Sequence, residues 1–398
     1  MKLHTKILLG LLLGAALGTS ANVFAHNPPW VQWFATNVAS PVGQIFLRLL
    51  LMTVIPLVFC SIVLGVAGLG DIRKVGRVGI RSISYFLIST AISATIGIVL
   101  VNAARPGEGL PPALRDQLMA AYQSRVDMLV NFFPRNPIQA AASMDMIGLI
   151  VFSLIFGAAL TLIPEEKAKP VIRVLDAVGE AIVKIIGMAM RLAPYGVFGL
   201  IFYVTSRLGL DIVRKLGAYV VVVILGLLLH GLGSLSVLVR VAGGLRPTVF
   251  FSRIRDSIGT AFSTSSSNAT LPTNIAVAEQ ELKIPPEIAG FVLPLGSTMC
   301  MNGTALFEGV TVLFLAQLFG ISLDLPTQMV VIVMSVITAV GAAGVPGGSL
   351  PLLMVVLGSV GVPPEGIGVV LGVDRILDMC RTTVNVVGDL TAAVYVAR

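Results

Sequence analysis

The sequence predicts an all-α polytopic membrane protein, and three observations carry that prediction. Of the 398 residues, 56% are hydrophobic and only 12% are charged, which is too apolar for a soluble enzyme or a disordered scaffold. The mean hydropathy is +0.95. The charged residues are clustered, and the uncharged runs between them suit helices that cross about 30 Å of hydrocarbon. The net charge of +7 lies in short loops, without a basic domain that could bind nucleic acid.

Uncharged runs predict six helices in the first 245 residues. The runs are Ile7–Phe24, Leu49–Gly70, Ser82–Ala104, Met146–Pro164, Leu192–Ser206 and Leu216–Val239. Glycine and proline within them are compatible with this prediction, because membrane helices contain more of both than soluble helices do.

The basic residues predict which loops face the cytoplasm. The first run also has the pattern of a secretory signal peptide, because Lys2 and Lys6 precede apolar Ile7–Leu17, so cleavage within residues 1–25 stays open. The distribution of Lys and Arg favours an uncleaved first helix with both chain termini in the cytoplasm. The basic connections at 71–81, 167–173 and 240–255 are then cytoplasmic, and the nearly charge-balanced connection at 105–137 is external.

Two later segments are interrupted near their centres. Ser257–Ala278 has a serine-rich centre, and Leu325–Pro364 is broken by glycine and proline at 344–349. Two half-helices that meet at such a tip form a re-entrant hairpin, which is tolerated in a membrane only beside protein or water. Full spans follow at Ile288–Phe319 and Gly366–Tyr395. The sequence thus predicts eight transmembrane helices plus two re-entrant helical hairpins in inverted repeats, a pattern that points to the binding site of a transporter.

The last span carries a polar stripe. At about 100° per residue, its polar side chains share one face about 80° wide. The stripe consists of Asp374, Asp378, Arg381, Asn385 and Asp389, with Arg375 at its edge. Such residues inside a membrane segment are functional by default and face a protein interior or a water-filled cavity. The alternative is an amphipathic helix near the interface whose charges snorkel to water.

The preceding span contains a predicted break and a single charge. Asn302 and Gly303 favour an interruption whose free carbonyls would coordinate a cation. Glu308 is the only charged residue between Ile288 and Leu323. Because burial favours the neutral form of a carboxyl group, Glu308 is a candidate for proton coupling. Alternatively, it pairs with an arginine.

Four ordered motifs resemble those of the excitatory amino acid (glutamate/aspartate) transporter family, the dicarboxylate/amino acid:cation symporters. They are Ser265–Pro272, Met301–Thr304, Gly344–Gly347 and Asp378–Asp389. The resemblance covers nearly the whole chain. It implies a homotrimer in the lipid of the plasma (inner) membrane, in which a peripheral transport domain slides like an elevator against a central scaffold. Residues 1–70 would form scaffold helices 1 and 2, 71–170 helices 3 and 4 with the external loop, 171–245 helices 5 and 6, and 246–398 the transport core, which helix 3 joins.

The resemblance also implies residue roles. Arg381 and Thr304 would hold the side-chain carboxylate of an acidic amino acid, and Asp378 and Thr382 its ammonium group. The remaining substrate-binding residues would be Ser266, Ser267, Asn385, Val345 and Gly348. A guanidinium group suits bidentate binding of a carboxylate.

No organic cofactor is implied, and the coupling ions would be sodium, protons or both. One sodium site would use Asp389 with the backbone of Gly296, Cys300 and Asn385. A second would use Thr298, Met301 and the backbone of Ala339, Val340 and Ala342. Carboxylate and carbonyl oxygens are the ligands that hard cations prefer.

Two departures from the family pattern bear on the ions. Cys300 and Asn302 stand where the family usually has asparagine and aspartate, and Phe86 stands where a third sodium site usually has tyrosine, although Ser89 and Thr90 are retained. The number of coupled sodium ions is therefore open. Glu308 occupies the position of a glutamate in proton-coupled members.

Three alternatives to the uptake of acidic amino acids are considered. Transport of a C4-dicarboxylate would leave Asp378 without an ammonium partner, and transport of a neutral amino acid would leave Arg381 without a carboxylate. A buried unmatched charge costs several kcal/mol. The third alternative, a membrane enzyme or an ion channel, is not favoured, because the sequence has no His/Cys metal cluster and its three histidines do not pair with a serine.

Overall fold

The computed structural model describes residues 3–23, 28–75, 77–108, 136–142, 146–208, 210–340, 342, 344 and 346–398. These residues form helices and connecting turns, with no strand among them. In the first half the helices are α1 (Leu3–Val23), α2 (Pro29–Phe34), η1 (Ala35–Ala39), α3 (Ser40–Val75), α4 (Arg77–Ala104), α6 (Pro137–Ala142), α7 (Met146–Leu162) and α8 (Glu165–Leu208). In the second half they are α9 (Leu210–Leu228), η3 (Leu229–Ser234), α10 (Leu235–Val241), α11 (Pro247–Arg253), α12 (Arg255–Thr264), α13 (Ser267–Gln280), α14 (Pro286–Met299), α15 (Asn302–Phe319), α16 (Leu325–Val340), α17 (Leu350–Ser359), η4 (Pro364–Gly366) and α18 (Ile367–Val396).

Several helices have the length and composition of membrane spans. Within the described residues, six helical stretches qualify: Thr5–Val23, Pro29–Ala67, Val78–Ala104, Glu165–Tyr203, Asp211–Val241 and Pro286–Phe319. Three shorter helical stretches are also apolar: Gly148–Leu162, Leu325–Val340 and Leu350–Ser359. The chain is therefore a multi-pass membrane protein built from helices, as its composition predicts.

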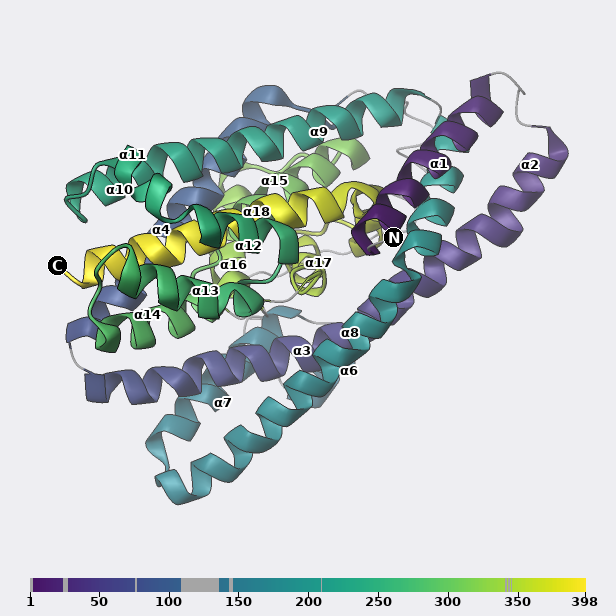
Figure 1. Cartoon of the computed structure of the whole chain (residues 1–398). Coiled ribbons are helices and arrows are strands. Elements are labelled where there is room, and N and C mark those ends of the chain that lie inside the picture. The colour runs from purple at the N-terminus through teal and green to yellow at the C-terminus, as the bar shows by residue number, and fades with distance from the viewer. Residues whose placement is uncertain are drawn as a thin grey trace.

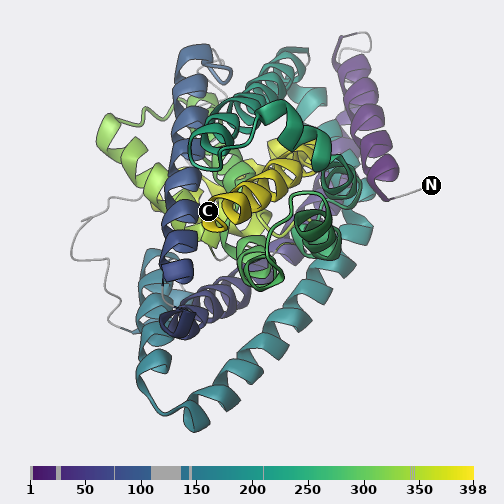
Figure 2. The same cartoon turned by 60° about the vertical axis from the view of Figure 1, so that its left-hand side comes forward.

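One group of helices lies on the outside of the molecule. The long helix α8 packs against both α1 and α3, and α3 also packs against α7. In Figure 1 α1 lies at the upper right, α3 and α8 run below the rest of the molecule, and α7 lies at the lower left; Figure 2 shows α8 as a long helix along the lower right edge. The sequence predicted only Leu192–Ser206 of this helix as apolar. The charged residues before it extend the helix because they occupy a mostly exposed amphipathic stretch.

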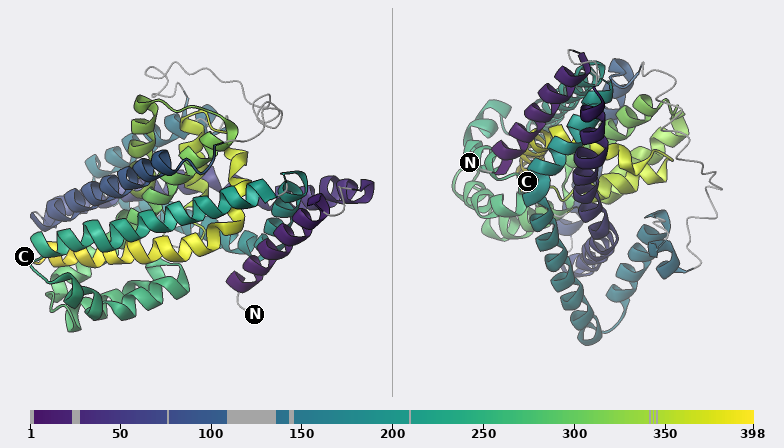
Figure 3. Two further views of the ribbon diagram at one scale, coloured as in Figure 1. Left: turned by 90° about the horizontal axis from the view of Figure 1, so that it is seen from above. Right: turned by 90° about the vertical axis from the view of Figure 1, so that its right-hand side faces the viewer.

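A second group of helices surrounds α15 and α18. Both are contacted by α4 and α9, and α18 is also contacted by α14. Figure 3 shows α9 and α18 running side by side. Nearly every residue of α15 is buried, as expected for a helix that is apolar on all sides. α18 is also largely buried, including its charged stripe. The stripe therefore faces the protein interior, and the alternative of an interfacial helix is wrong.

Two helix pairs border this core. In the first pair α12 packs against α13, and in the second pair α16 packs against α17. Two serines form the turn of the first pair: Ser265 ends α12 in the left-handed conformation with φ 53°, and Ser266 caps α13 by accepting a hydrogen bond from the Ala269 backbone. At the other end of the second pair, Asp324 caps α16. Hydrogen bonds from Thr327 hold the pKa of the Asp324 carboxyl below its usual range.

Candidate functional site

The interruption between α14 and α15 lies directly against α18. α14 ends at Met299 and α15 begins at Asn302, which confirms the predicted break. Asn385 on α18 holds the new helix start, because its Oδ1 atom accepts hydrogen bonds from the backbone of Gly303 at 2.7 Å and Thr304 at 3.4 Å. Gly303 permits this approach, since a Cβ atom there would collide with the Arg381 backbone.

Three helices begin at the same place. The N-termini of α13, α15 and α17 border one cavity, which Ser267, Thr304 and Ser349 line from these three helix starts. The N-terminus of a helix carries partial positive charge and unpaired N–H groups. The arrangement therefore favours an anionic group in the cavity.

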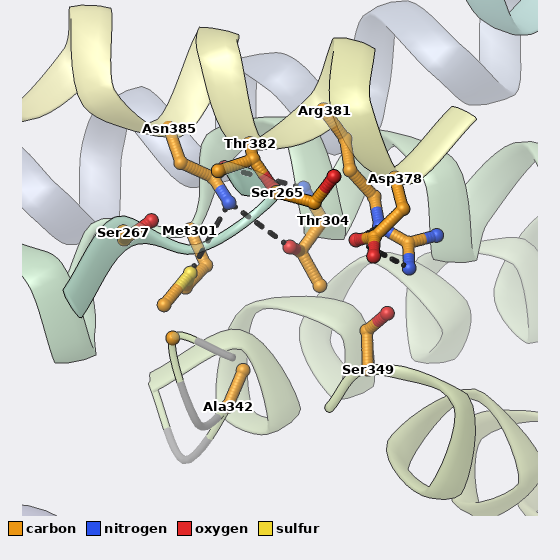
Figure 4. A pocket seen from close by; sticks show the side chains of 11 residues that line it. Ser265, Ser267, Met301, Thr304, Ala342, Ser349, Asp378, Arg381, Thr382 and Asn385 are labelled. Carbon is orange, nitrogen blue, oxygen red and sulfur yellow. Dashed lines mark hydrogen bonds and ion pairs between the residues drawn. The ribbon is translucent and has the colours of Figure 1, made fainter. Parts of the chain in front are cut away.

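The cavity itself is small and polar. Figure 4 shows side chains from α18, the α15 start and both helix pairs converging on it. Its volume is about 20 Å³, close to what one water molecule needs. The tips of the two pairs close it: the Ser266 hydroxyl donates to the Gly344 carbonyl at 2.6 Å, and the Gly347 N–H donates to Asp378 at 3.1 Å.

Four charged side chains from α18 form one ion cluster beside the cavity. Arg381 lies between two carboxylates, 2.8 Å from Asp374 and 2.9 Å from Asp378. Arg375 lies 3.4 Å from the other oxygen of Asp378. The Arg381 side chain is only 1% exposed, and its guanidinium group stacks 4.2 Å above the centroid of the Phe307 ring. Two positive and two negative charges balance, which a buried cluster requires.

Asp389 is a separate buried carboxylate further along the stripe. It is fully buried, and neither of its oxygens has a hydrogen-bond partner among the described residues. It lies against α14, because a Cβ atom on Gly296 would stand 2.7 Å from its Oδ1 atom. An unpaired buried carboxylate is costly unless a cation accompanies it. Asp389 and the nearby carbonyls are thus suited to a hard cation.

Asn302 occupies the region of the expected third sodium site. Its Oδ1 atom accepts hydrogen bonds from Ser89 at 3.1 Å and Thr90 at 2.9 Å, while Ser93 donates to its backbone carbonyl. Its amide nitrogen has no partner within the described part of the chain. The hydroxyl groups that would face a cation therefore donate to a neutral amide instead.

Glu308 lies outside the ion cluster. Its side chain is fully buried on α15, and its nearest polar partner is the Thr338 hydroxyl of α16 at 2.7 Å. No arginine forms an ion pair with it among the described residues. The alternative of an arginine partner is therefore not supported.

The structure brings most of the expected substrate residues together. Those that line the cavity are Ser267, Thr304, Asp378, Arg381, Thr382 and Asn385. Ser266 instead caps α13 and contacts Gly344, and Gly348 is buried beside Gly347 at the tip of the second pair. Val345 lies outside the described residues.

The expected cation residues are more dispersed. Met301 and Ala342 line the same cavity as the substrate residues, Ala339 is buried nearby on α16, and Cys300 is buried beside Asn302. The Val340 carbonyl lies close to Gly65 of α3. Thr298 is exposed, and its hydroxyl donates to the Leu295 carbonyl of its own helix. The described residues contain no cluster of three His, Cys, Asp or Glu side chains of the kind that holds a transition metal.

Three cavity residues were not among the expected set. Ser265 directly follows the end of α12, Ser349 directly precedes the start of α17, and Gly344 is the point where the two tips meet. Their proximity to the expected serines and to the Gly344–Gly347 motif was the available signal. Ser349 Oγ has no partner within the described residues, so it is free to bind a ligand.

An all-helical membrane protein whose interrupted helices aim their N-termini and a balanced ion cluster at one cavity has the construction of a secondary transporter. The model of the sodium:dicarboxylate symporter family matches residues 3–398. The chain belongs to this family. It is 33% identical to a proton/glutamate-aspartate symporter of Escherichia coli (strain K12), over 99% of this chain and 92% of the relative. It is 34% identical to a proton/sodium-glutamate symport protein of Bacillus subtilis (strain 168), over 100% of this chain and 92% of the relative. A C4-dicarboxylate transport protein of Anaeromyxobacter sp. (strain K) is 33% identical, over 100% of this chain and 89% of that protein.

Proposed function

We propose that the protein is a secondary active symporter that takes up glutamate or aspartate, driven by sodium and/or proton gradients. The observation that carries this proposal is the adjacency of Arg381 and Asp378 at the cavity. An acidic amino acid presents a carboxylate and an ammonium group, which match this pair of opposite charges. The names of the relatives from Escherichia coli and Bacillus subtilis agree with this substrate class.

Asp378 and Thr382 would bind the ammonium group, and Arg381 with Thr304 the side-chain carboxylate. Ser266, Ser267 and Asn385 would receive the main carboxylate, together with the backbone at Val345 and Gly348. The N-termini of α13 and α15 support both carboxylates electrostatically.

We assign one sodium ion to Asp389, with carbonyls of Gly296, Cys300 and Asn385. A second would lie near Met301 and the end of α16, with Thr298, Ala339, Val340 and Ala342 as the further candidates. Because Ser89 and Thr90 donate to the Asn302 amide, we propose that no third sodium binds there. A proton on Glu308 would replace it.

The mechanism would be of the elevator type in a homotrimer of the plasma (inner) membrane, with both termini cytoplasmic. The proposed architecture has eight transmembrane helices and two re-entrant hairpins, which correspond to α12–α13 and α16–α17. The outer helices α1, α3, α7 and α8 would form the scaffold, and residues 246–398 with α4 the moving core. Because α9 packs against α4, α15 and α18, we place it in the moving core as well.

Uptake into proteoliposomes tests the function. Purified protein would be reconstituted and given labelled aspartate or glutamate under imposed sodium, proton or no gradients. Gradient-driven accumulation, and counterflow of labelled substrate into preloaded vesicles, are expected. Neither a channel nor an enzyme performs counterflow, so its absence with every acidic substrate would contradict the proposal.

Transport of C4-dicarboxylates is the second candidate. The specific observation in its favour is that Asp378 already has a positive partner in Arg375, in addition to the similarity to C4-dicarboxylate transport proteins. A neutral amino acid is less compatible with the site, because it offers Arg381 no second carboxylate.

A further inference from the structure

Both carboxylate oxygens of Asp378 already have polar partners in the structure. Its Oδ1 atom contacts Arg381, with Nε at 3.1 Å and the terminal nitrogen at 2.9 Å. Its Oδ2 atom contacts the Gly347 N–H at 3.1 Å and Arg375 at 3.4 Å. Asp378 therefore already has hydrogen-bond and charge partners before the ammonium group of a ligand reaches it.

When a ligand enters the cavity, some of these partners of Asp378 must move away and one stays in place. The cavity of about 20 Å³ is too small for an amino acid, so the tip that carries Gly347 must move away. Arg381 must turn toward the ligand carboxylate. Arg375 is three residues from Asp378 on the same helix, so this pair stays together whatever the tip does. Among the described partners of Oδ2, only Arg375 stays in place.

The ion pair between Arg375 and Asp378 matters most for a ligand that has no amine. Succinate would bring two carboxylates to the site and no group for Asp378. With Arg375 in place, Asp378 keeps a positive partner, and the charge opposite the ligand is compensated. Without Arg375, Asp378 would stand buried, unpaired and close to a second anion, which opposes binding of the amine-free ligand.

We propose that Arg375 is a specificity-determining residue whose ion pair with Asp378 lets the site accept C4-dicarboxylates as well as acidic amino acids. The inference rests on the proposed function of the site. Arg375 acts through Asp378 and does not itself contact the ligand. Its side chain is 10% exposed, and its Nε atom has no partner within the described residues, so its main described interaction is this pair.

Competition binding on the purified full-length protein tests the role of Arg375. The dissociation constants of succinate and aspartate are measured in saturating sodium, and their ratio is compared between variants. Arg375→Gln should raise the succinate-to-aspartate ratio at least about tenfold, because only the amine-free ligand needs the pair. Arg375→Lys, which keeps the charge, should stay within about threefold of the parent ratio. The exposed arginine variant Arg253→Gln is the matched control and should leave both constants unchanged.

A double variant separates an effect through Asp378 from a direct contact. Arg375→Gln combined with Asp378→Asn contains no unpaired charge at this position, so it also covers the case in which Arg375→Gln alone does not fold. It should bind succinate within about tenfold of the parent while losing aspartate. Loss of succinate by more than about a hundredfold in the double variant would show that Arg375 contacts the ligand directly and would overturn the proposal.

Two further outcomes would also overturn it. One is an unchanged ratio in Arg375→Gln, and the other is a parent protein that binds aspartate but not succinate. These results differ from failure of the proposed function, in which the parent would bind neither aspartate nor glutamate.

Discussion

Glu308 and the Thr338 hydroxyl are within hydrogen-bond distance of each other, and the same hydroxyl also contacts the Met334 carbonyl. The Thr338 hydroxyl lies 2.7 Å from Glu308 Oε2 and 2.7 Å from the Met334 carbonyl. A hydroxyl group has a single hydrogen to donate. If Glu308 is protonated, its O–H donates to Thr338 and Thr338 donates to Met334, so both short contacts are hydrogen bonds, while Glu308 Oε1 has no partner within the described residues. The contact is thus built for the neutral acid.

The first prediction concerns this carboxyl group. Glu308→Gln fixes a neutral side chain, so net uptake should lose its dependence on an inward pH gradient. Exchange of internal and external substrate in sodium should survive, because exchange does not require the carrier to return deprotonated. Both are measured in proteoliposomes, with Glu287→Gln on the exposed start of α14 as the control. A parent whose net uptake ignores an imposed pH gradient would remove Glu308 from the coupling path.

The second prediction concerns Arg381. Replacing it with alanine removes the partner of the ligand carboxylate, and aspartate affinity should fall by about 2 to 5 kcal/mol, as for other broken buried charge pairs. Serine, which has no second carboxylate, should then compete better relative to aspartate. The measurement is the ratio of the two dissociation constants. A variant that prefers aspartate over serine as strongly as the parent would refute this role.

The third prediction concerns Asp389. Asp389→Asn keeps the shape of the side chain and removes its charge, which leaves nothing to balance a cation. Because ion and substrate can couple only through reciprocal changes in affinity, the sodium dependence of aspartate affinity should weaken. Aspartate titrations at several sodium concentrations measure it, with exposed Asp256→Asn as the control. An unchanged dependence would place the ion elsewhere.

The fourth prediction concerns Asn302. Asn302→Asp puts a carboxylate among the Ser89, Thr90 and Ser93 hydroxyls without breaking a hydrogen bond of the amide nitrogen, which has no described partner. In sodium-free medium the buried charge should lower the melting temperature, and added sodium should raise it more than in the parent, since a bound ion stabilises the folded state. Thermal unfolding with and without sodium measures this. Equal sodium responses of variant and parent would mean that these oxygens do not form a cation site.

The polar stripe and the helix break could be predicted from the sequence, because both are local. A period of 3.6 residues places Asp374, Asp378 and Arg381 on one face, and Asn302-Gly303 interrupts an apolar helix. Neither pattern shows that Arg381 pairs with the two aspartates of its own helix or stacks on Phe307. Those contacts depend on side-chain conformations and on how closely α15 approaches α18.

The two tips were also beyond the reach of periodicity. Ser265, Gly344 and Ser349 join the cavity only because the two helix pairs, which are far apart in the sequence, meet there. The length of α8 was underestimated for a different reason. Its first half is charged, and hydropathy alone does not distinguish an exposed amphipathic stretch from a loop.

The tip of the second helix pair competes with the substrate for groups of the proposed binding site. The Gly344 carbonyl accepts a hydrogen bond from the Ser266 hydroxyl, and the Gly347 N–H donates one to Asp378. The carbonyl thus occupies a group proposed for the substrate carboxylate, and the N–H occupies the group proposed for the substrate ammonium. A substrate must therefore displace these intramolecular hydrogen bonds of the tip before it can bind to the same groups. Its apparent affinity is then its intrinsic affinity reduced by the fraction of molecules in which the tip has withdrawn. Sequence changes in the tip that keep the backbone at Val345 and Gly348 in place can therefore tune how tightly the transporter binds its substrate without altering a substrate contact.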